Sequence, residues 1–128
     1  MDANFNRLKE GLRVCEDVLR FVYEDQRLTA SLKRFRHRCS AVMLSLPVTY
    51  RKLVSVRESQ RDVGKNHSIR DRQRLKWYDL FVSNMKRAQE SLRVLEETAK
   101  VAVPAHVRKF QSLRFGLYGL EKKILKKL

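Results

Sequence analysis

Arginine and glutamate side chains recur in the same order in two segments of this chain. Residues 6–17 read NRLKEGLRVCED and residues 86–97 read KRAQESLRVLEE, so the second segment repeats the first after 80 positions. Two helices that only pack together need matching apolar residues, but they do not need matching charges. Arginine binds phosphate or carboxylate oxygens through paired hydrogen bonds. The repeat therefore suggests that both copies contribute to one site for an anionic ligand.

On a helical wheel, part of this polar pattern falls among the apolar residues. The positions within the apolar arc are Asn4, Arg7 and Gly11 in the first copy and Asn84, Arg87 and Ser91 in the second. Glu10 and Glu90 lie at the edge of the arc, whereas Arg13, Glu16, Asp17 and Arg20 lie opposite it, where charge is solvated.

A guanidinium that faces the interior needs an anionic partner. Two explanations stay open at this point. One is a pair of structural ion pairs, Arg7–Glu10 and Arg87–Glu90, which helical spacing permits. The other is a polar cavity in which both arginines bind phosphate, and in which the small side chains at positions 11 and 91 leave room for a ligand.

Apolar residues recur at helical spacing over four segments, and glycine and proline are scarce. The expected helices span residues 2–24, 27–46, 76–102 and 105–127. The pattern predicts one all-α domain over 1–128, a four-helix bundle built from a duplicated hairpin (2–46 and 76–127). The halves are joined by a long ordered loop over 47–75, with a short helix near 49–54.

The loop contains SVRESQRDVGKN, which offers further groups for an anion or a metal. Arg57 is basic, and Gly64 can turn backbone N–H groups toward a phosphate. Asp62 beside them could hold Mg²⁺.

Composition narrows the function further. A net charge of +15 favours polyanions or phosphorylated small molecules as ligands. The basic clusters at 33–38, 70–76 and 122–127 occupy different elements and carry no interleaved aromatic platform, so we do not expect nucleic acid as the ligand. The dispersed histidines do not suit a di-iron bundle, and no apolar run has membrane length. Cys15 and Cys39 are expected to be free buried thiols in a reducing cytosol.

Four stretches, DANFNRLKEGLRVCEDVLRF, LKRFRHR, RDVG and AQESLRVLEETAK, resemble the small hydroxymethylpyrimidine-phosphate kinases of bacterial thiamine synthesis. These occur alone or fused in front of thiamine-phosphate synthase, and this chain resembles the stand-alone form or an excised domain. The resemblance implies a cytoplasmic enzyme that phosphorylates 4-amino-5-hydroxymethyl-2-methylpyrimidine phosphate to the diphosphate with ATP and Mg²⁺. It also implies a functional link to thiamine-phosphate synthase, and a split site would allow a homodimer.

The resemblance carries these family motif positions onto this sequence: Asn4, Asn6, Arg7, Glu10, Arg13, Asp17, Arg57, Asp62, Gly64, Glu90, Arg93 and Glu96. We then expect catalytic roles for Arg7, Arg87, Glu10 and Glu90. Binding roles are expected for Asn4, Asn6, Arg13, Arg57, Gly64, Asn84 and Arg93, and a metal-binding role for Asp62. Two alternatives remain: a non-catalytic module that binds nucleic acid or another polyanion, and a metal-independent isomerase similar to chorismate mutase.

Overall fold

The structure, a computed structural model, describes residues 2–47 and 76–128. Its helices are α1 (Asp2–Asp17), continued by the π-helical turn η1 (Val18–Val22), then α2 (Gln26–Leu44), α5 (Trp77–Ala102), the 3₁₀ turn η2 (Pro104–His106) and α6 (Val107–Lys127). These ranges contain no strand, and the predicted all-α four-helix bundle is confirmed. The predicted helix near 49–54 and the loop residues Arg57, Asp62 and Gly64 lie outside the described residues.

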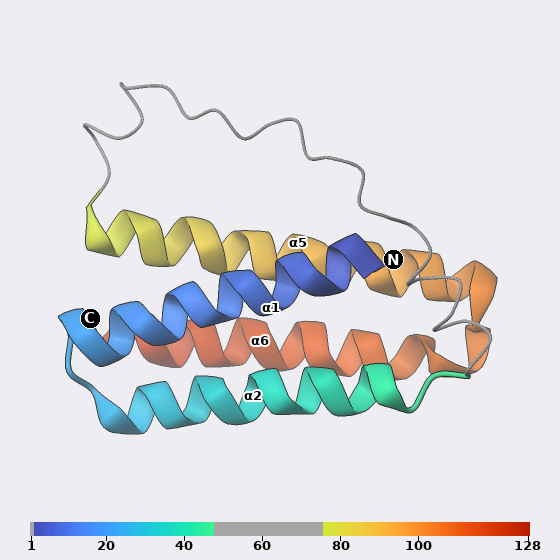
Figure 1. The fold of residues 1–128 in the computed structure, drawn as a ribbon, viewed down its shortest axis with the longest axis horizontal. Coiled ribbons are helices and arrows are strands. Elements are labelled where there is room, and N and C mark those ends of the chain that lie inside the picture. Colours follow the sequence, from blue (N-terminus) through green and yellow to red (C-terminus); the bar gives the residue numbers. More distant parts are fainter. Residues whose placement is uncertain (1, 48–75) are drawn as a thin grey trace.

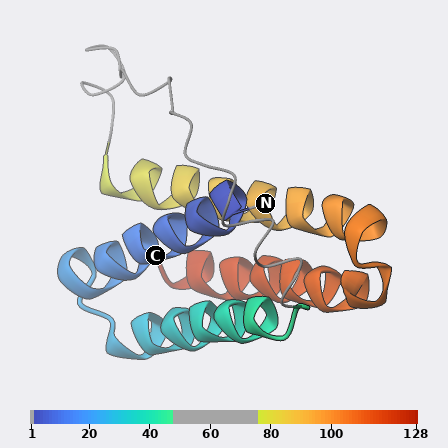
Figure 2. The same ribbon diagram turned by 45° about the vertical axis from the view of Figure 1, so that its right-hand side comes forward.

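The four long helices form a ring in which each helix packs on two neighbours, in the order α1, α5, α6, α2 (Figures 1 and 2). Neighbouring helices run antiparallel. The α1/α5 and α2/α6 contacts therefore lie on opposite sides of the bundle. None of the helices in the described ranges has the length and hydropathy of a transmembrane span.

Local hydrogen bonds fix the turn between α1 and α2. The N–H of Tyr23 donates to the carbonyl of Val18 at 3.2 Å, a spacing of five residues that closes the π-helical turn. Glu24 takes a positive φ of 50°, and the Asp25 side chain then accepts from the N–H of Leu28 at 2.9 Å. The helix expected to reach residue 24 therefore ends at Val22, and α2 begins at Gln26.

A single apolar cluster joins all four long helices, and it includes Leu12, Leu32, Leu92 and Leu117. Both cysteines lie within this cluster and are free, as the sequence predicted. Burial raises the pKa of the Cys15 and Cys39 thiols to about 12. Neither thiol is therefore an effective nucleophile near neutral pH.

The closest approach of α1 to α5 occurs at Gly11. A Cβ atom at this position would lie 2.9 Å from the carbonyl oxygen of Asn84 and 3.7 Å from the Cβ of Ala88. Glycine is therefore required because the backbone of α5 fills the space that a side chain would occupy. The expectation that Gly11 leaves room for a ligand is wrong, and Ser91, its counterpart on α5, is buried as well.

The Gly11 contact can be tested with two matched glycine substitutions. Gly11→Ala should lower the free energy of unfolding by about 1–3 kcal/mol, because α1 and α5 must move apart. Gly119→Ala should raise it by up to about 1 kcal/mol, because alanine favours helix and no heavy atom lies within 4 Å of the new Cβ. Urea denaturation of both variants measures the difference, and equal stabilities would contradict the close contact.

Candidate functional site

The register of α1 against α5 brings the two copies of the polar repeat together. Gly11 meets Asn84 and Ala88, and the Cys15 thiol donates to the carbonyl of Phe81 at 3.4 Å. Residue numbers therefore rise along α1 as they fall along α5. Arg7 lies one turn before Gly11, whereas Arg87 lies next to Ala88, which Gly11 meets, so the two arginines are offset by about one helical turn along the α1/α5 contact.

A set of charged residues borders this contact on the outer surface, and we call it the α1/α5 face. Its members are Arg7, Glu10 and Arg13 on α1 and Arg87, Glu90 and Arg93 on α5, and all six are exposed. The repeat thus presents one polar pattern twice on one surface. The shared site therefore stays a prediction, and the residues proposed for it lie on the outside of the bundle.

The prediction that Arg7 and Arg87 face the interior is wrong, because both side chains are exposed. They stand at the border of the apolar arc, where a long side chain covers apolar surface with its stem and keeps its charge in water. The ion pairs within residues 2–47 and 76–128 join neither Arg7 to Glu10 nor Arg87 to Glu90. The structural ion-pair explanation therefore fails as well.

The three candidate asparagines differ in how far their side chains are exposed to a ligand. Asn6 is exposed and Asn4 is half-buried. Asn84 is buried, and its side-chain N–H donates to the carbonyl of Leu80 in the same helix at 2.9 Å. Asn84 therefore has a structural contact, whereas Asn4 and Asn6 remain accessible to a ligand beside Arg7.

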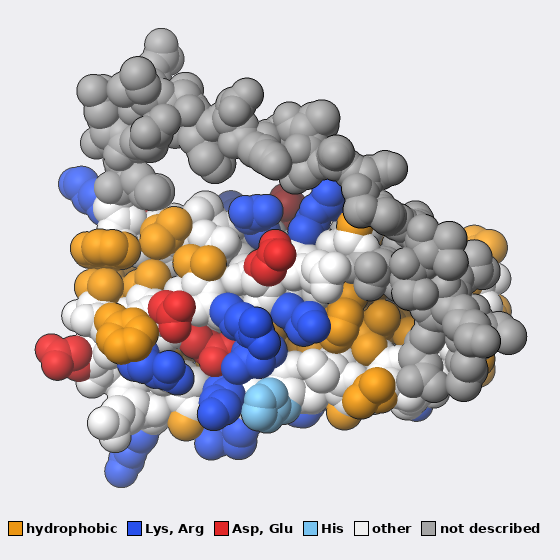
Figure 3. Space-filling view, in the orientation of Figure 1, with side chains coloured by type: hydrophobic (Ala, Val, Ile, Leu, Met, Phe, Trp, Pro, Cys, Tyr) orange, Lys and Arg blue, Asp and Glu red, His pale blue; other side chains and the backbone are white. Residues whose placement is uncertain are grey.

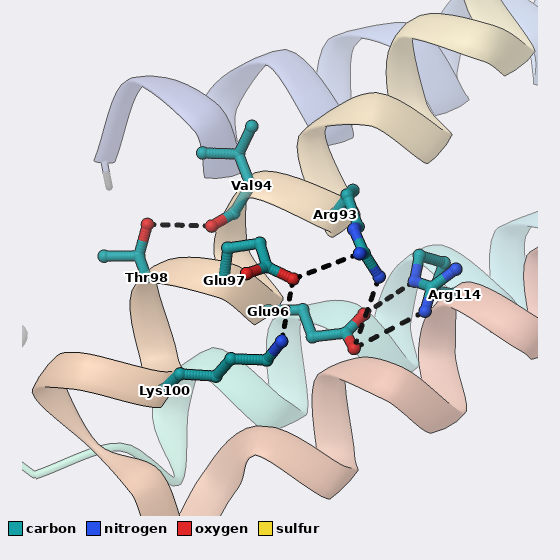
Figure 4. A network of polar contacts seen from close by, with 7 residues as sticks. All are labelled: Arg93, Val94, Glu96, Glu97, Thr98, Lys100 and Arg114. Atoms are coloured by element: carbon teal, nitrogen blue, oxygen red, sulfur yellow. Dashed lines mark hydrogen bonds and ion pairs between the residues drawn. The ribbon is translucent and has the colours of Figure 1, made fainter.

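Two buried glutamate–arginine pairs were missed by the sequence analysis. The Arg36 guanidinium donates to both carboxylate oxygens of Glu16, at 2.5 and 3.1 Å, and thereby ties α2 to α1. Arg114 does the same with Glu96, at 2.6 and 3.4 Å, and ties α6 to α5 (Figure 4). The hydrogen bonds that these guanidinium groups donate to the carboxylates raise the pKa of Arg36 and of Arg114.

The placement of Glu16 on a solvated surface is therefore wrong, since only 3% of the residue is exposed. The repeat itself held the signal. Glu16 and Glu96 are separated by 80 positions, and Arg36 and Arg114 by 78, so both partners of each pair recur. Part of the duplicated polar pattern thus stabilises each hairpin, and the exposed remainder is left for another role.

Arg93 connects the α1/α5 face to one of these pairs (Figure 4). Its guanidinium lies 3.8 Å from the Glu96 carboxylate and 3.2 Å from that of Glu97. A hydrogen bond from Lys100 to Glu97, at 2.9 Å, lowers the pKa of the Glu97 carboxyl. Arg93 is therefore held in place by its own helix while half of its side chain stays exposed.

The exposed carboxylates of the α1/α5 face suit a metal ion that is held mainly by the phosphate oxygens of a bound ligand. Within residues 2–47 and 76–128, no three histidine, cysteine or acidic side chains are grouped as a metal site. Mg²⁺ in nucleotide sites needs only one or two carboxylates, because phosphate oxygens and waters complete its shell. Glu10 and Glu90, both exposed on the α1/α5 face, meet that requirement.

Comparison with known protein families identifies the family of this chain. The model of the ThiD2 family matches residues 1–123. The chain belongs to the ThiD2 family. The resemblance seen in the sequence is thereby confirmed over nearly the whole of the chain.

Curated relatives of this chain are named thiamine-phosphate synthase. The protein of Prochlorococcus marinus strain MIT 9313 is 34% identical over 125 residues, covering 98% of this chain and 34% of the relative. The Synechococcus sp. CC9605 protein is 37% identical over 124 residues (94% and 33%). The Synechocystis sp. PCC 6803 protein is 33% identical over 126 residues (98% and 35%). This chain spans about a third of their length, and no solved structure matches it.

Substitution of two neighbouring glutamates distinguishes the contribution of the Glu96–Arg114 pair to stability from that of a surface charge. Glu96→Gln should lower the free energy of unfolding by about 2–4 kcal/mol, because the substitution leaves a largely buried guanidinium without its anion. Glu97→Gln removes an exposed carboxylate and should leave the denaturation midpoint nearly unchanged. Chemical denaturation compares the two variants, and equal effects would mean that the buried pair contributes no more than surface charge.

Proposed function

We propose that this chain phosphorylates 4-amino-5-hydroxymethyl-2-methylpyrimidine phosphate to the diphosphate, with ATP and Mg²⁺, in thiamine biosynthesis. The observation that carries this proposal is the α1/α5 face, an exposed set of four arginines and two glutamates that the core does not need. Membership of the ThiD2 family and the name of the relatives support the pathway.

The reaction joins two anions, so its main obstacle is electrostatic. An oxygen of the substrate phosphate attacks the γ-phosphorus of ATP, and the bond from that phosphorus to the bridging oxygen of ADP breaks. A phosphate monoester has a second pKa near 6, so its oxygen is already ionised at neutral pH and needs no strong base. Positioning and charge neutralisation are then the tasks left to the protein.

The arrangement of the arginines suits those two tasks. Arg7 and Arg87 lie on either side of the α1/α5 contact, about one turn apart, and their long side chains can both donate to the substrate phosphate. Arg13 and Arg93 lie farther along their antiparallel helices, toward opposite ends of the face, and we assign one or the other of them to the nucleotide phosphates. Each such charge-assisted contact contributes about 1.5–3 kcal/mol to stabilising the transition state on this exposed face, which is less than in a site that excludes water.

The two ends of the α1/α5 face are not equivalent, because Lys86 stands where the first copy has Asn6. A neutral amide at one end and a cation at the other can distinguish the pyrimidine from the more highly charged nucleotide. Mg²⁺ on the nucleotide would neutralise its β- and γ-phosphates, and Glu10 and Glu90 are the described residues that would hold it. The predicted ligands in the loop, Asp62 and Arg57, lie outside the described residues.

An assay of ADP release tests the proposal. ADP should form with the pyrimidine monophosphate, because that substrate carries the phosphate that the arginines bind, and should not form with the free alcohol. EDTA should stop the reaction. Equal turnover of the free alcohol would contradict the assigned substrate, and ligand conversion without ATP and Mg²⁺ would favour the isomerase alternative.

Substitution of the paired arginines tests the site itself. Arg7→Ala and Arg87→Ala should each lower kcat/KM by about 10- to 150-fold, which corresponds to the loss of one exposed charge-assisted phosphate contact. Their helical circular dichroism should be unchanged, because both side chains are exposed. Lys122→Ala, which removes an exposed cation from α6, is the matched control and should retain activity. Unfolding of the arginine variants would indicate a structural role instead.

A further inference from the structure

The positive charge of this chain is unevenly distributed over the helices. The segment α1–η1 holds four Lys or Arg and four acidic residues, and α5 does too. By contrast, α2 holds five cations and no acidic residue, and α6 holds seven cations and one acidic residue, Glu121. The two helices that carry the excess pack side by side, opposite the α1/α5 face.

A groove follows the contact between these two helices. Its central hollow has a volume of about 730 Å³, and hollows of about 420 and 340 Å³ continue it in the two directions through shared lining residues. On α2 the lining runs from Arg27 to Val42, which corresponds to a length of about 23 Å. We call this feature the α2/α6 groove.

Cations line the α2/α6 groove on both sides. The lining includes Arg27, Arg34 and Arg38 on α2 and Arg108, Lys123 and Lys127 on α6. No acidic side chain is among the residues that line these three hollows. On the side of the bundle drawn in Figure 3, acidic and basic side chains mix over α1, whereas the charged side chains over α2 are basic.

The bottom of the groove is apolar and has little side-chain bulk. Gly116 faces Phe35 across the groove, and Gly119 and Leu120 complete this part of the lining. A Cβ at Gly116 would lie 3.6 Å from the Phe35 ring, while at Gly119 it would meet nothing within 4 Å. A flat apolar group can therefore lie between the two rows of cations.

The packing of α2 against α6 brings together two basic clusters that are far apart in the sequence. The basic clusters at 33–38 and 122–127 belong to different helices, α2 and α6. The antiparallel packing of α2 and α6 brings Arg34 and Arg38 of the first cluster and Lys123 of the second to one hollow. The two clusters form one continuous cationic surface.

We propose that the α2/α6 groove binds single-stranded RNA. Rows of cations beside an apolar strip match a chain that alternates phosphates with flat bases. Neighbouring helices are about 8–10 Å apart, which suits one strand better than a duplex. Ser31, Ser112 and His37 in the lining can hydrogen-bond to 2′-hydroxyl groups, which single-stranded DNA lacks.

Fluorescence anisotropy with a labelled RNA of about 12 nucleotides, a length typical of small single-strand binders, tests this proposal on the full chain. Binding should weaken with salt by about 0.7 in log–log slope for each phosphate neutralised. Arg34→Ala combined with Lys123→Ala should weaken binding at least 10-fold and reduce the slope by about 1.4. Lys86→Ala combined with Lys100→Ala removes the same charge from exposed positions on α5 and should have a much smaller effect.

Equal weakening by the two double variants would overturn the proposal, because it would indicate net charge alone. Equal or tighter binding of DNA of the same sequence, of duplex RNA or of a glutamate-rich helical peptide would overturn the choice of ligand. The inference does not rest on the proposed kinase activity, since the groove and the α1/α5 face lie on opposite sides of the bundle. The Arg87→Ala variant should lose ADP release but should bind RNA as tightly as the unsubstituted protein.

Discussion

The close antiparallel contact of α1 and α5 at Gly11 is the constraint on which the rest of this molecule depends. The carbonyl of Asn84 occupies the place of a side chain at position 11, so the register of the two helices has little freedom. That register puts the two copies of the repeat on one surface, with Arg7 and Arg87 on either side of the contact about one turn apart. The buried pairs Glu16–Arg36 and Glu96–Arg114 then attach α2 and α6 in equivalent ways. A duplicated sequence thus becomes a bundle with two functional sides.

The polar residues of the repeat serve different physical purposes. Glu16 and Glu96 are satisfied by arginines from the next helix, so their charges are buried without being isolated. The residues of the α1/α5 face have no comparable packing role, and their duplication is best explained by a ligand that carries two centres of negative charge. The excess cations of α2 and α6 belong to neither group. They form a separate surface whose chemistry suits a longer polyanion.

Helical periodicity was sufficient to predict the helices, the bundle and the buried thiols of Cys15 and Cys39. It failed for residues whose surroundings come from another helix. Glu16 looks solvated on a wheel because the wheel contains no Arg36, and Gly11 looks like empty space because the wheel contains no α5. A helical wheel gives the direction of each Cα–Cβ bond, but it does not give the position of the guanidinium at the end of a long side chain. Arg7 and Arg87 were therefore predicted to face the interior, although their charged groups reach water. The recurrence of Glu16 and Arg36 as Glu96 and Arg114 was the one feature of the sequence that could have indicated the buried pairs.

The central claim is that Arg7 and Arg87 bind one phosphate group from opposite sides of the α1/α5 contact. The side-chain Nε–Hε resonances of arginine report such binding directly in a nuclear magnetic resonance titration with the pyrimidine monophosphate. We expect the signals of Arg7 and Arg87 to shift together and saturate at the same ligand concentration, while those of the buried Arg36 and Arg114 stay in place. Shifts confined to Arg34 and Arg38, or independent saturation of Arg7 and Arg87, would contradict the account.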